Sequence, residues 1–365
     1  MLEISLNSIK KNYTYLKSQL GNGVACAAVV KADAYGLGIK KISQALIEAG
    51  CKDFFVTNCN EGVNLRDVLS TSQSSAVTSA DVYVLHGVSN DDEADACVQY
   101  GLTPVLNHVG QSEVWKKKAN KLGNPLSAIL HIDTGLNRLG FPFEDVHNFI
   151  ESQRSTPNME LRYIMSHLSC ADTPTHDSNA SQLKNFLEIA TLFPNVPLTF
   201  ANSSGIFLGP GYHFNMVRPG AAMYGFSPTP HTLNPMLPVL TLKAKILQRK
   251  VLEQKSCVGY GAAYIADTGS KLLIIECGYS NGYCRMLNIC GKAYVAGYFL
   301  PIAGRISMDL CTLDASILPN NIFLNVDFVE LLNEHLTIDD LAKAANTIPY
   351  ELSIILGSHC KRVYK

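Results

Sequence analysis

The feature of the sequence that most constrains the fold is a regular alternation between residues 24 and 220, where short β-branched runs are separated by longer segments of helical periodicity. This alternation predicts parallel strands, because a crossover helix must return the chain before the next strand can run in the same direction. The runs are VACAAVVK (24–31), DFFVTN (53–58), DVYVLHG (81–87), TPVLN (103–107), SAILHID (127–133), LRYIMSHL (161–168), LTFANSS (198–204) and FNMVRPG (214–220). Eight runs favour an α/β fold with an N-terminal (β/α)8 TIM-type barrel over an open doubly wound sheet. The link between the last two runs, GIFLGPGYH, is too short for a full helix.

A different pattern begins near residue 236. The remaining segments, of which VLTLKAKILQRKVL is an example, are rich in β-forming residues and are separated by Gly and Asn turns. One helix is expected to follow them, opening at Thr337, where Thr337 and Asp340 resemble a capping box. We therefore expect a barrel domain over residues 1–235 and a mostly antiparallel β-domain over residues 236–365, with which the first ten or so residues pair.

Composition excludes several classes of function. A chain of 365 residues, 47% of them hydrophobic, can bury a sizeable core, and its net charge of −1 gives no electrostatic argument for nucleic acid or an anionic membrane. The N-terminus lacks the pattern of a signal peptide, and no apolar stretch reaches the length of a membrane span. The 11 cysteines form no CxxC pair and no cluster with metal-ligand spacing. We expect a cytoplasmic protein with reduced thiols, no metal, and a small-molecule substrate.

Polar residues end almost all of the predicted strands, whose interiors are apolar. In (β/α)8 enzymes the chemistry lies at the C-terminal ends of the strands. Polar strand ends can equally be the solvated beginnings of loops, so the position alone does not establish a role. The final polar residues of the eight runs are Lys31, Asn58, His86, Asn107, Asp133, His167, Ser203 and Arg218.

Lys31 is the strand end with the most specific chemical implication. Most lysines extend to solvent, and that interpretation remains open for this one. However, Lys31 follows five apolar residues at the expected mouth of the barrel. Partial desolvation there lowers the pKa of an amine and makes it a nucleophile, which is suited to a Schiff base with an aldehyde cofactor.

The loops after the last two strands point to a phosphate-bearing cofactor. These loops often bind phosphate in barrel enzymes, and here they contain Ser203, Gly220 and Ala221, which offer a hydroxyl and unobstructed backbone N–H groups. A phosphate site opposite a lysine suggests pyridoxal 5′-phosphate, although the segment RPG alone would be interpreted as an ordinary turn. Arg218 would face the pyridine nitrogen, to which it can donate but from which it cannot accept a proton. This arrangement suits a reaction that only removes and returns a proton.

These residues belong to motifs through which the sequence resembles bacterial alanine racemase over essentially its whole length. The motifs follow the order of that family, and each lies in the expected structural context. They are AVVKADAYGLG (28–38), HIDTGLNRLGF (131–141), SHLSCAD (166–172), ANSSGIFLG (201–209), NMVRPGAAMYG (215–225), VGYGAAY (258–264), GYSNGYCR (278–285) and PIAGRISMDL (301–310).

The resemblance implies roles for individual residues. Lys31 would carry pyridoxal 5′-phosphate covalently, and Tyr260 would be the second catalytic base. The residues implied to bind the phosphate are Tyr35, Ser203, Gly220 and Ala221; Arg218 would contact the pyridine nitrogen, and His167 and Asn202 would line the cofactor site. Near the substrate it implies Tyr279, Met308 and Asp309, with Arg138 at the substrate carboxylate.

The resemblance also implies an assembly and a physiological role. The expected state is a homodimer in which the second domain of one subunit completes the barrel site of the other. The expected product, D-alanine, would supply peptidoglycan synthesis. Without the resemblance, Tyr260 and Met308 would be interpreted as ordinary packing residues.

Some positions depart from the pattern of the family, among them Asn281, Ser358 and His359, and the most informative is His131. Many members have a lysine, often carbamylated, where this chain has His131, and the carbamate orients the arginine that corresponds to Arg138. That positioning device is expected to be missing or rebuilt here, with Asn137 as one candidate. A broad-specificity or serine-preferring racemase stays open as an alternative. A decarboxylase or a cofactor-carrier protein of related fold is less consistent with Arg218 and with the second domain.

Overall fold

The structure, a computed structural model, describes residues 1–70, 80–155, 158–288 and 290–365. It divides into two compact units. The barrel unit consists of residues 9–34 and 39–236. The C-terminal unit consists of residues 237–365 together with 1–8 and the short segment 35–38.

The barrel unit is built on a parallel sheet whose spatial order is β2-β10-β9-β8-β7-β6-β5-β4-β3. Apart from the first part of β8, its strands are buried along most of their length, since helices cover them on the outside and side chains fill the inside. The strands are β2 (Ala25–Cys26), β3 (Ala28–Val29), β4 (Asp53–Val56), β5 (Asp81–Val84), β6 (Leu102–Leu106), β7 (Leu126–His131), β8 (Met159–Met165), β9 (Leu198–Thr199) and β10 (Met216–Val217).

The barrel closes through its first strand run. Strands β2 and β3 are two parts of this run, interrupted at Ala27; β2 pairs with β10, and β3 pairs with β4. The backbone N–H of Val29 donates to the Pro219 carbonyl, and that of Val30 donates to the Phe55 carbonyl, each at 2.9 Å. Because one run bonds to both ends of the strand order, the sheet is a barrel, and the predicted fold class is confirmed.

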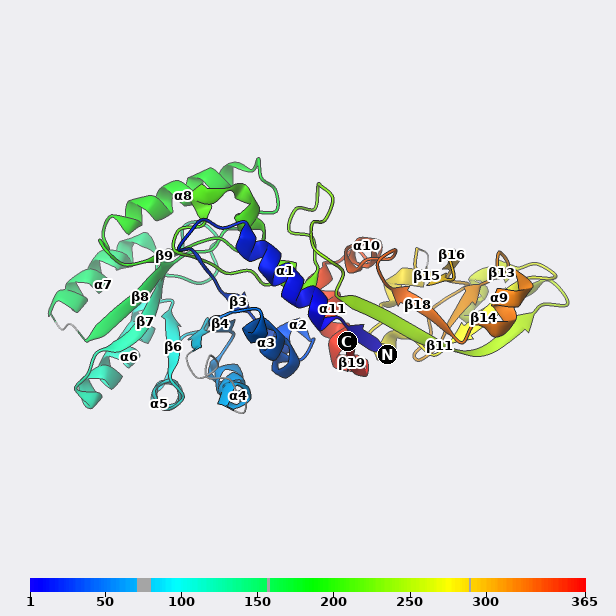
Figure 1. The fold of residues 1–365 in the computed structure, drawn as a ribbon, viewed down its shortest axis with the longest axis horizontal. Helices are drawn as coiled ribbons and strands as arrows, with labels where there is room; N and C mark the ends of the chain where they lie inside the picture. Colours follow the sequence, from blue (N-terminus) through cyan, green and yellow to red (C-terminus); the bar gives the residue numbers. More distant parts are fainter. Residues whose placement is uncertain (71–79, 156–157, 289) are drawn as a thin grey trace. The chain divides into compact units, whose positions relative to one another are not determined.

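Helices surround the barrel strands, with α4 to α8 on their outer side in Figure 1. Helix α3 illustrates how the sequence produces this packing: its buried residues Ile42, Ala45 and Leu46 form one apolar face at helical spacing. Between β9 and β10 lie only two short 3-10 helices, as expected from the length of this link. The helices of this part of the chain are α1 (Leu6–Ser18), α3 (Ile39–Glu48), α4 (Cys59–Ser70), α5 (Asp91–Gln99), α6 (Val109–Leu122), α7 (Phe143–Ser155), α8 (Asp177–Ala190), η1 (Ser204–Leu208), η2 (Pro210–Tyr212) and η3 (Ala221–Tyr224).

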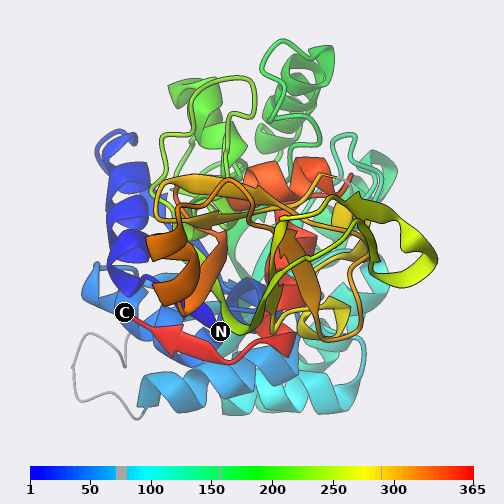
Figure 2. The same cartoon turned by 90° about the vertical axis from the view of Figure 1, so that its right-hand side faces the viewer.

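The C-terminal unit is a mostly antiparallel sheet, with the strand path β16-β15-β18-β11-β1-β19; β14 pairs with β11, and β17 pairs with β14. Strand β1 pairs antiparallel with β11 and parallel with β19, so both chain termini lie in this sheet (Figure 2). Strands β12 and β13 form a separate hairpin. The strands are β1 (Leu2–Ile4), β11 (Leu240–Val251), β12 (Ser256–Val258), β13 (Tyr264–Ala266), β14 (Lys271–Ile275), β15 (Lys292–Val295), β16 (Tyr298–Pro301), β17 (Cys311–Asp314), β18 (Phe328–Leu332) and β19 (Arg362–Tyr364).

The predicted capping box is confirmed, whereas the prediction of one helix in this unit is wrong. Thr337 Oγ1 accepts from the Asp340 N–H, and the Asp340 side chain accepts in return at the start of α10 (Ile338–Ala344). Two further α-helices are α9 (Asn320–Asn325) and α11 (Pro349–His359). The first is too short to show a period, and the second has no clearly amphipathic pattern. No helix in the described ranges has both the length and the apolar character that crossing a membrane would require.

Candidate active site

Lys31 opens a left-handed turn directly after the first barrel strand. The strand pairing ends at Val30, one residue earlier than predicted, and residues 31–35 form the turn α2 (Lys31–Tyr35). Its residues from Ala32 to Tyr35 have φ angles of 53° to 57°. A left-handed helical conformation costs roughly 1–2 kcal/mol for each non-glycine residue, so the turn requires fixed partners. The Ala34 N–H donates to the Val30 carbonyl, and Asp33 Oδ1 accepts from the Ile39 N–H, each at 2.8 Å.

The surroundings of Lys31 favour its neutral amine. Burial lowers its pKa, and the positive charge of Arg138 lowers it further, while the carboxylate of Glu61 acts in the opposite direction. Because only the neutral amine is a nucleophile, the lowered pKa makes Lys31 more reactive near neutral pH than an exposed lysine.

Arg218 follows β10 and is a buried cation, with 4% of its surface exposed. Nη1 donates to Thr199 Oγ1, and Nη2 donates to the Ser166 carbonyl, each at 2.6 Å. Among the described residues no carboxylate forms an ion pair with Arg218. Burial lowers its pKa to about 9, so the guanidinium stays charged at neutral pH. A buried cation without an anionic partner is a site for an electron-rich ligand.

Two neutral histidines lie beside this cation. His167 Nδ1 is 3.4 Å from Arg218 Nη2, and His131 Nδ1 is 2.8 Å from Asn107 Oδ1. Burial first, and Arg218 second, lower the pKa of His131 to about 3 and the pKa of His167 well below its ordinary value. The two imidazole rings therefore add no positive charge beside Arg218 at neutral pH.

Arg138 lies in the loop after β7 and is exposed. Asp133, at the end of that strand, accepts from the Gly135 and Leu136 N–H groups at 2.9 Å each and so shapes the loop. Asn137 has a left-handed backbone with φ of 55°. The buried ring of His131 has a hydrogen-bond partner in Asn107, which directly follows the neighbouring strand β6.

A cradle of backbone N–H groups surrounds Ser203. Its Oγ accepts from the Gly220 N–H at 3.0 Å and from the Ala222 N–H at 3.2 Å. The N–H of Ala221 lies between these two in the chain, is part of a residue that is 4% exposed, and has no partner among the described residues. An unpaired buried N–H at the start of a turn, next to a hydroxyl, suits a phosphate oxygen. Asn202 Oδ1 accepts from the Gly205 N–H at 2.9 Å, at the start of the 3-10 helix that follows Ser203.

Tyr35 belongs to the C-terminal unit, where its backbone packs on α11. Ser353 Oγ donates to the Tyr35 carbonyl at 2.8 Å, and the rings of Tyr35 and Tyr350 are 5.9 Å apart. At Gly36 a Cβ would lie 2.8 Å from the Ile354 Cα, so the close approach requires glycine. The sequence analysis did not single out Tyr350.

The remaining predicted residues lie on adjacent loops of the C-terminal unit. Tyr260 is in η4 (Tyr260–Ala262), and Tyr279 is in η5 (Tyr279–Asn281). The Tyr279 N–H donates to the Ser307 carbonyl at 3.2 Å, beside Met308 and Asp309. The side chains of Tyr260, Met308 and Tyr279 are 71%, 60% and 44% exposed. The structure thus gathers these residues in one unit, and Lys31, Arg138, His167, Asn202, Ser203, Arg218, Gly220 and Ala221 in the other.

Comparison with known proteins assigns the family. Residues 4–228 match the family described as "Alanine racemase, N-terminal domain", and residues 239–364 match "Alanine racemase, C-terminal domain". The chain belongs to the alanine racemase family. It is 41% identical to a catabolic alanine racemase of Mesorhizobium japonicum, covering 100% of this chain and 93% of that protein. It is 38% identical to an alanine racemase of Rhodospirillum rubrum, covering 100% and 95% respectively.

A solved structure supports the same assignment. Alanine racemase from Bartonella henselae, with covalently bound pyridoxal phosphate, superimposes with a TM-score of 0.91 at 34% identity, covering 100% of this chain and 99% of that one. The resemblance inferred from the motifs is therefore confirmed, as is the architecture of a barrel followed by a β-rich domain.

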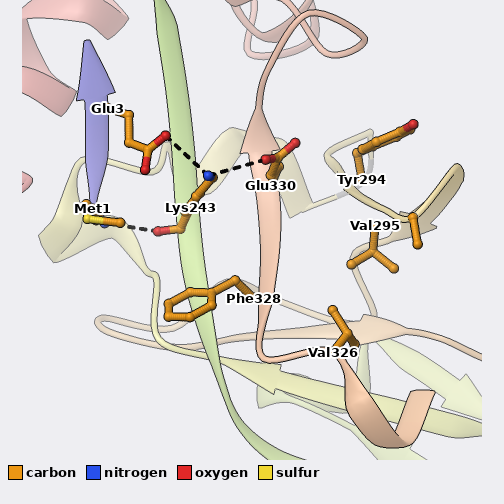
Figure 3. Close-up of a pocket in the computed structure, with 9 residues that line it drawn as sticks. Met1, Glu3, Lys243, Tyr294, Val295, Val326, Phe328 and Glu330 are labelled. Carbon is orange, nitrogen blue, oxygen red and sulfur yellow. Dashed lines mark hydrogen bonds and ion pairs between the residues drawn. The ribbon is translucent and has the colours of Figure 1, made fainter. Parts of the chain in front are cut away.

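A cavity in the C-terminal unit is separate from these family motifs. It has a volume of about 510 Å³ and lies over β11, β15 and β18. At its wall the Lys243 ammonium lies 3.2 Å from the Glu3 carboxylate and 3.8 Å from that of Glu330 (Figure 3). None of the predicted site residues lines it. Its cation is already paired, so it does not provide an anion site for an alanine racemase.

Several residues that shape this alanine racemase site were missed by the sequence analysis. Thr199 forms a hydrogen bond with Arg218, and the backbone of Ala222 forms one with Ser203; neither residue type indicates such a role in the sequence. Glu61 accepts a hydrogen bond from the backbone immediately after Lys31. The pattern Asn58-x-x-Glu61, which is typical of a helix N-terminus, was the available signal for it.

Proposed function

We propose that this chain is an alanine racemase that interconverts L-alanine and D-alanine with pyridoxal 5′-phosphate as its cofactor. The observation that carries the proposal is the set of groups at the mouth of the barrel. An amine with a lowered pKa, a buried guanidinium without an ion-pair partner and an N–H cradle beside Ser203 lie at the ends of strands that pair with one another. The names of the relatives and the cofactor in the Bartonella henselae enzyme support this proposal.

The residues present fit this cofactor. Lys31 would bind its aldehyde carbon covalently, and Arg218 would donate to its ring nitrogen. His167 and Asn202 would line the ring. The phosphate would be held by Ser203, the N–H groups of Gly220 and Ala221, and Tyr35. The unpaired N–H of Ala221 is the group in this cradle with free capacity to donate.

The proposed chemistry is the transfer of one proton at Cα. When bound, pyridoxal 5′-phosphate withdraws electrons from the amino acid joined to it and so acidifies the Cα–H bond. Lys31 Nζ acts on one face of Cα and Tyr260 Oη acts on the other, one as base and one as acid. The roles exchange in the reverse direction, which makes the enzyme active on both enantiomers.

Arg218 restricts the reaction to proton transfer. It is charged at neutral pH and has no proton-accepting atom, so it donates to the ring nitrogen without protonating it. A carboxylate in that position would stabilise the protonated ring and extend the lifetime of the Cα carbanion, as decarboxylation and transamination require. The buried guanidinium therefore favours racemisation.

The substrate would be held by residues from both units. Arg138 would bind the substrate carboxylate, and Tyr279, Met308 and Asp309 would contact the substrate. We propose a homodimer in which these loops of one subunit complete the barrel site of its partner. The support is that Tyr260, Tyr279 and Met308 are large side chains left exposed in a single chain.

The proposed setting is the cytoplasm, where the product supplies D-alanine to peptidoglycan. Its support is that all 11 cysteines are free thiols. The printed name of the Mesorhizobium japonicum relative favours a second role, the breakdown of alanine. A deletion strain separates the two: a requirement for added D-alanine indicates supply, whereas loss of growth on alanine as carbon source indicates breakdown.

Exchange in heavy water tests the reaction itself. Incubation of the enzyme with L-alanine in D2O should give D-alanine labelled at Cα, detected by chiral chromatography and mass spectrometry. A panel of L-amino acids, including serine, tests for broader specificity. Lys31→Ala should lose the covalently bound cofactor and its absorbance. Retention of that absorbance, or no exchange at Cα by the unmodified enzyme, contradicts the proposal.

A further inference from the structure

The carboxylate of Glu61 joins two parts of the barrel mouth. Oε1 accepts from the Ala32 N–H at 2.9 Å, and Oε2 accepts from the Thr57 N–H at 2.7 Å. Ala32 directly follows Lys31 and is the first residue with a left-handed backbone, while Thr57 directly follows β4. Glu61 therefore ties the turn that carries the lysine to the end of the neighbouring strand.

The hydrogen bond that Glu61 accepts from Thr57 belongs to an ordinary helix cap. Asn58 Oδ1 accepts from the Glu61 N–H at 3.0 Å at the start of α4. The next barrel helix, α5, begins in the same way: Asn90 Oδ1 accepts from the Glu93 N–H at 2.9 Å, and Glu93 Oε2 accepts from the Ser89 N–H at 2.6 Å.

The two caps differ in their second carboxylate oxygen. Oε1 of Glu61 reaches the lysine turn. In the part of the chain that the structure describes, Oε1 of Glu93 has no corresponding hydrogen bond. A cap needs only one of the two oxygens, so the bond to Ala32 is additional to what α4 requires.

The left-handed turn is held by backbone and side-chain hydrogen bonds, of which this is one. Within the turn the Ala34 N–H is satisfied by the Val30 carbonyl, and Asp33 anchors the far end through the Ile39 N–H. At the start of the turn, next to Lys31, the Ala32 N–H donates to Glu61, which is its acceptor among the described residues. A carboxylate acceptor gives a charge-assisted bond, which fixes direction more strongly than a neutral one.

The charge of Glu61 also acts on the lysine. The charged groups that face Lys31 are Arg138, from the loop after β7, and Glu61, from α4. His167, after β8, is neutral at neutral pH. Arg138 and burial lower the pKa of Lys31, and Glu61 is the group that opposes them.

We propose that Glu61 is a positioning residue for Lys31: it uses a helix cap to hold the left-handed turn and places its negative charge beside the amine. This inference rests on the proposed role of Lys31 as the residue that binds the cofactor. It extends that role to a residue on a different strand-helix connection, and it accounts for a turn that the sequence KADAY does not favour by itself.

The test compares Glu61→Gln with Glu93→Gln in the full-length protein. Both variants replace one carboxylate oxygen with an amide NH2 group. The oxygen that remains can accept the single hydrogen bond of the Glu93 cap, whereas Glu61 loses one of its two accepted bonds together with the charge near Lys31. Cofactor is removed by dialysis, and pyridoxal 5′-phosphate is then added back over a range of pH. Covalent attachment is measured by absorbance and by borohydride reduction followed by peptide mapping of Lys31.

For Glu61→Gln we expect cofactor affinity to fall about tenfold, as for a lost charge-assisted hydrogen bond. The pH at which attachment is half as fast as its maximum should move down, because removal of the negative charge of Glu61 lowers the pKa of the Lys31 amine. Glu93→Gln should change neither quantity. Equal behaviour of the two variants overturns the proposal.

Hydrogen exchange separates this inference from the proposed function. In protein without cofactor, Glu61→Gln should speed amide exchange in a peptide spanning residues 28–35, and Glu93→Gln should not. If the unmodified protein attaches no cofactor at Lys31, the proposed function fails, and the exchange comparison still decides whether Glu61 holds the turn. Unchanged exchange in Glu61→Gln shows that it does not.

Discussion

The mouth of the barrel unit and the loops of the C-terminal unit hold the candidate residues in opposite ways. Arg218 and Ser203 are 4% and 5% exposed, and each is fixed by hydrogen bonds to neighbouring strands or turns. Tyr260 and Met308 are 71% and 60% exposed, and neither side chain forms a hydrogen bond or ion pair within the described ranges. The barrel half is therefore arranged by its own chain. The loops of the C-terminal unit present their side chains on a surface, as expected if they contribute to the barrel site of a partner subunit.

The largest expected effect is a loss of racemisation on substitution of Tyr260, in the exposed loops of the C-terminal unit. Tyr260→Phe removes one exposed oxygen, so the melting temperature and cofactor content should not change. Racemisation measured by chiral chromatography should fall on the order of 10³-fold, because the acid or base on one face of Cα is lost. The matched control is Tyr15→Phe, in which a tyrosine that is 39% exposed on α1 loses the same oxygen. Full activity in Tyr260→Phe would mean that a different group acts on that face.

On the buried side, Arg218→Lys should affect stability and activity together. A lysine supplies one donor group where the guanidinium reaches Thr199 Oγ1 and the Ser166 carbonyl, leaving a buried acceptor unpaired. We expect a loss of about 2–4 kcal/mol in the free energy of unfolding and a loss of activity of at least tenfold. Urea denaturation measures the first and chiral chromatography the second. Arg162→Lys, at an exposed ion pair with Asp81, is the control and should change stability by less than about 0.5 kcal/mol.

Dilution tests whether the two halves come from different chains. If they do, activity per mole of enzyme should fall as the dimer dissociates, while pyridoxal 5′-phosphate stays bound to the barrel unit. Mass photometry gives the dimer fraction, and a coupled assay gives the activity at the same concentrations. Constant activity in samples that contain only monomer would show that one chain suffices.

The last test is the response of stability to acid, which leaves activity at neutral pH unchanged. Burial and Arg218 hold the pKa of His131 at about 3 in the folded protein, below the roughly 6.5 of an exposed histidine. Below pH 6.5 the unfolded chain therefore binds a proton at His131 that the folded protein does not. As the pH falls from 6.5 toward 3, this difference should lower the free energy of unfolding by about 1.4 kcal/mol per pH unit.

The variant His131→Gln isolates that contribution. It keeps an acceptor and donor next to Asn107 but cannot be protonated, so urea denaturation between pH 7 and pH 4.5 should show a shallower loss of stability than in the unmodified protein. His167, whose pKa is also lowered, should remain the source of the residual slope. An unchanged slope would show that His131 does not contribute.

A single sequence signal found the residues of the barrel mouth. Lys31, Ser203 and Arg218 are polar residues at the ends of apolar runs, and the barrel brings such ends together. The same signal also selected Asn58 and Asp133, whose side chains are occupied by local turns and caps. Position at a strand end therefore locates the candidate site without separating the residues proposed to act from those that shape the loops.

Other features depend on contacts that one sequence does not encode locally. The segment KADAY would form a right-handed turn by its own propensity, and the bonds from Val30 and Glu61 that hold it left-handed come from the assembled barrel. Helix α11 buries residues without an amphipathic stripe, so periodicity could not reveal it. Tyr350 meets Tyr35 only because segment 35–38 packs on that helix.

Closure of the barrel has a consequence for how the enzyme is made. The first strand run bonds to β10, which is among the last parts of the barrel unit to leave the ribosome. Until that pairing forms, a nascent chain has Lys31 without Arg218 or the Ser203 cradle beside it. If these residues bind the cofactor as proposed, a chain can capture it only after the barrel has closed, and long-range closure of this kind is slow compared with local helix formation.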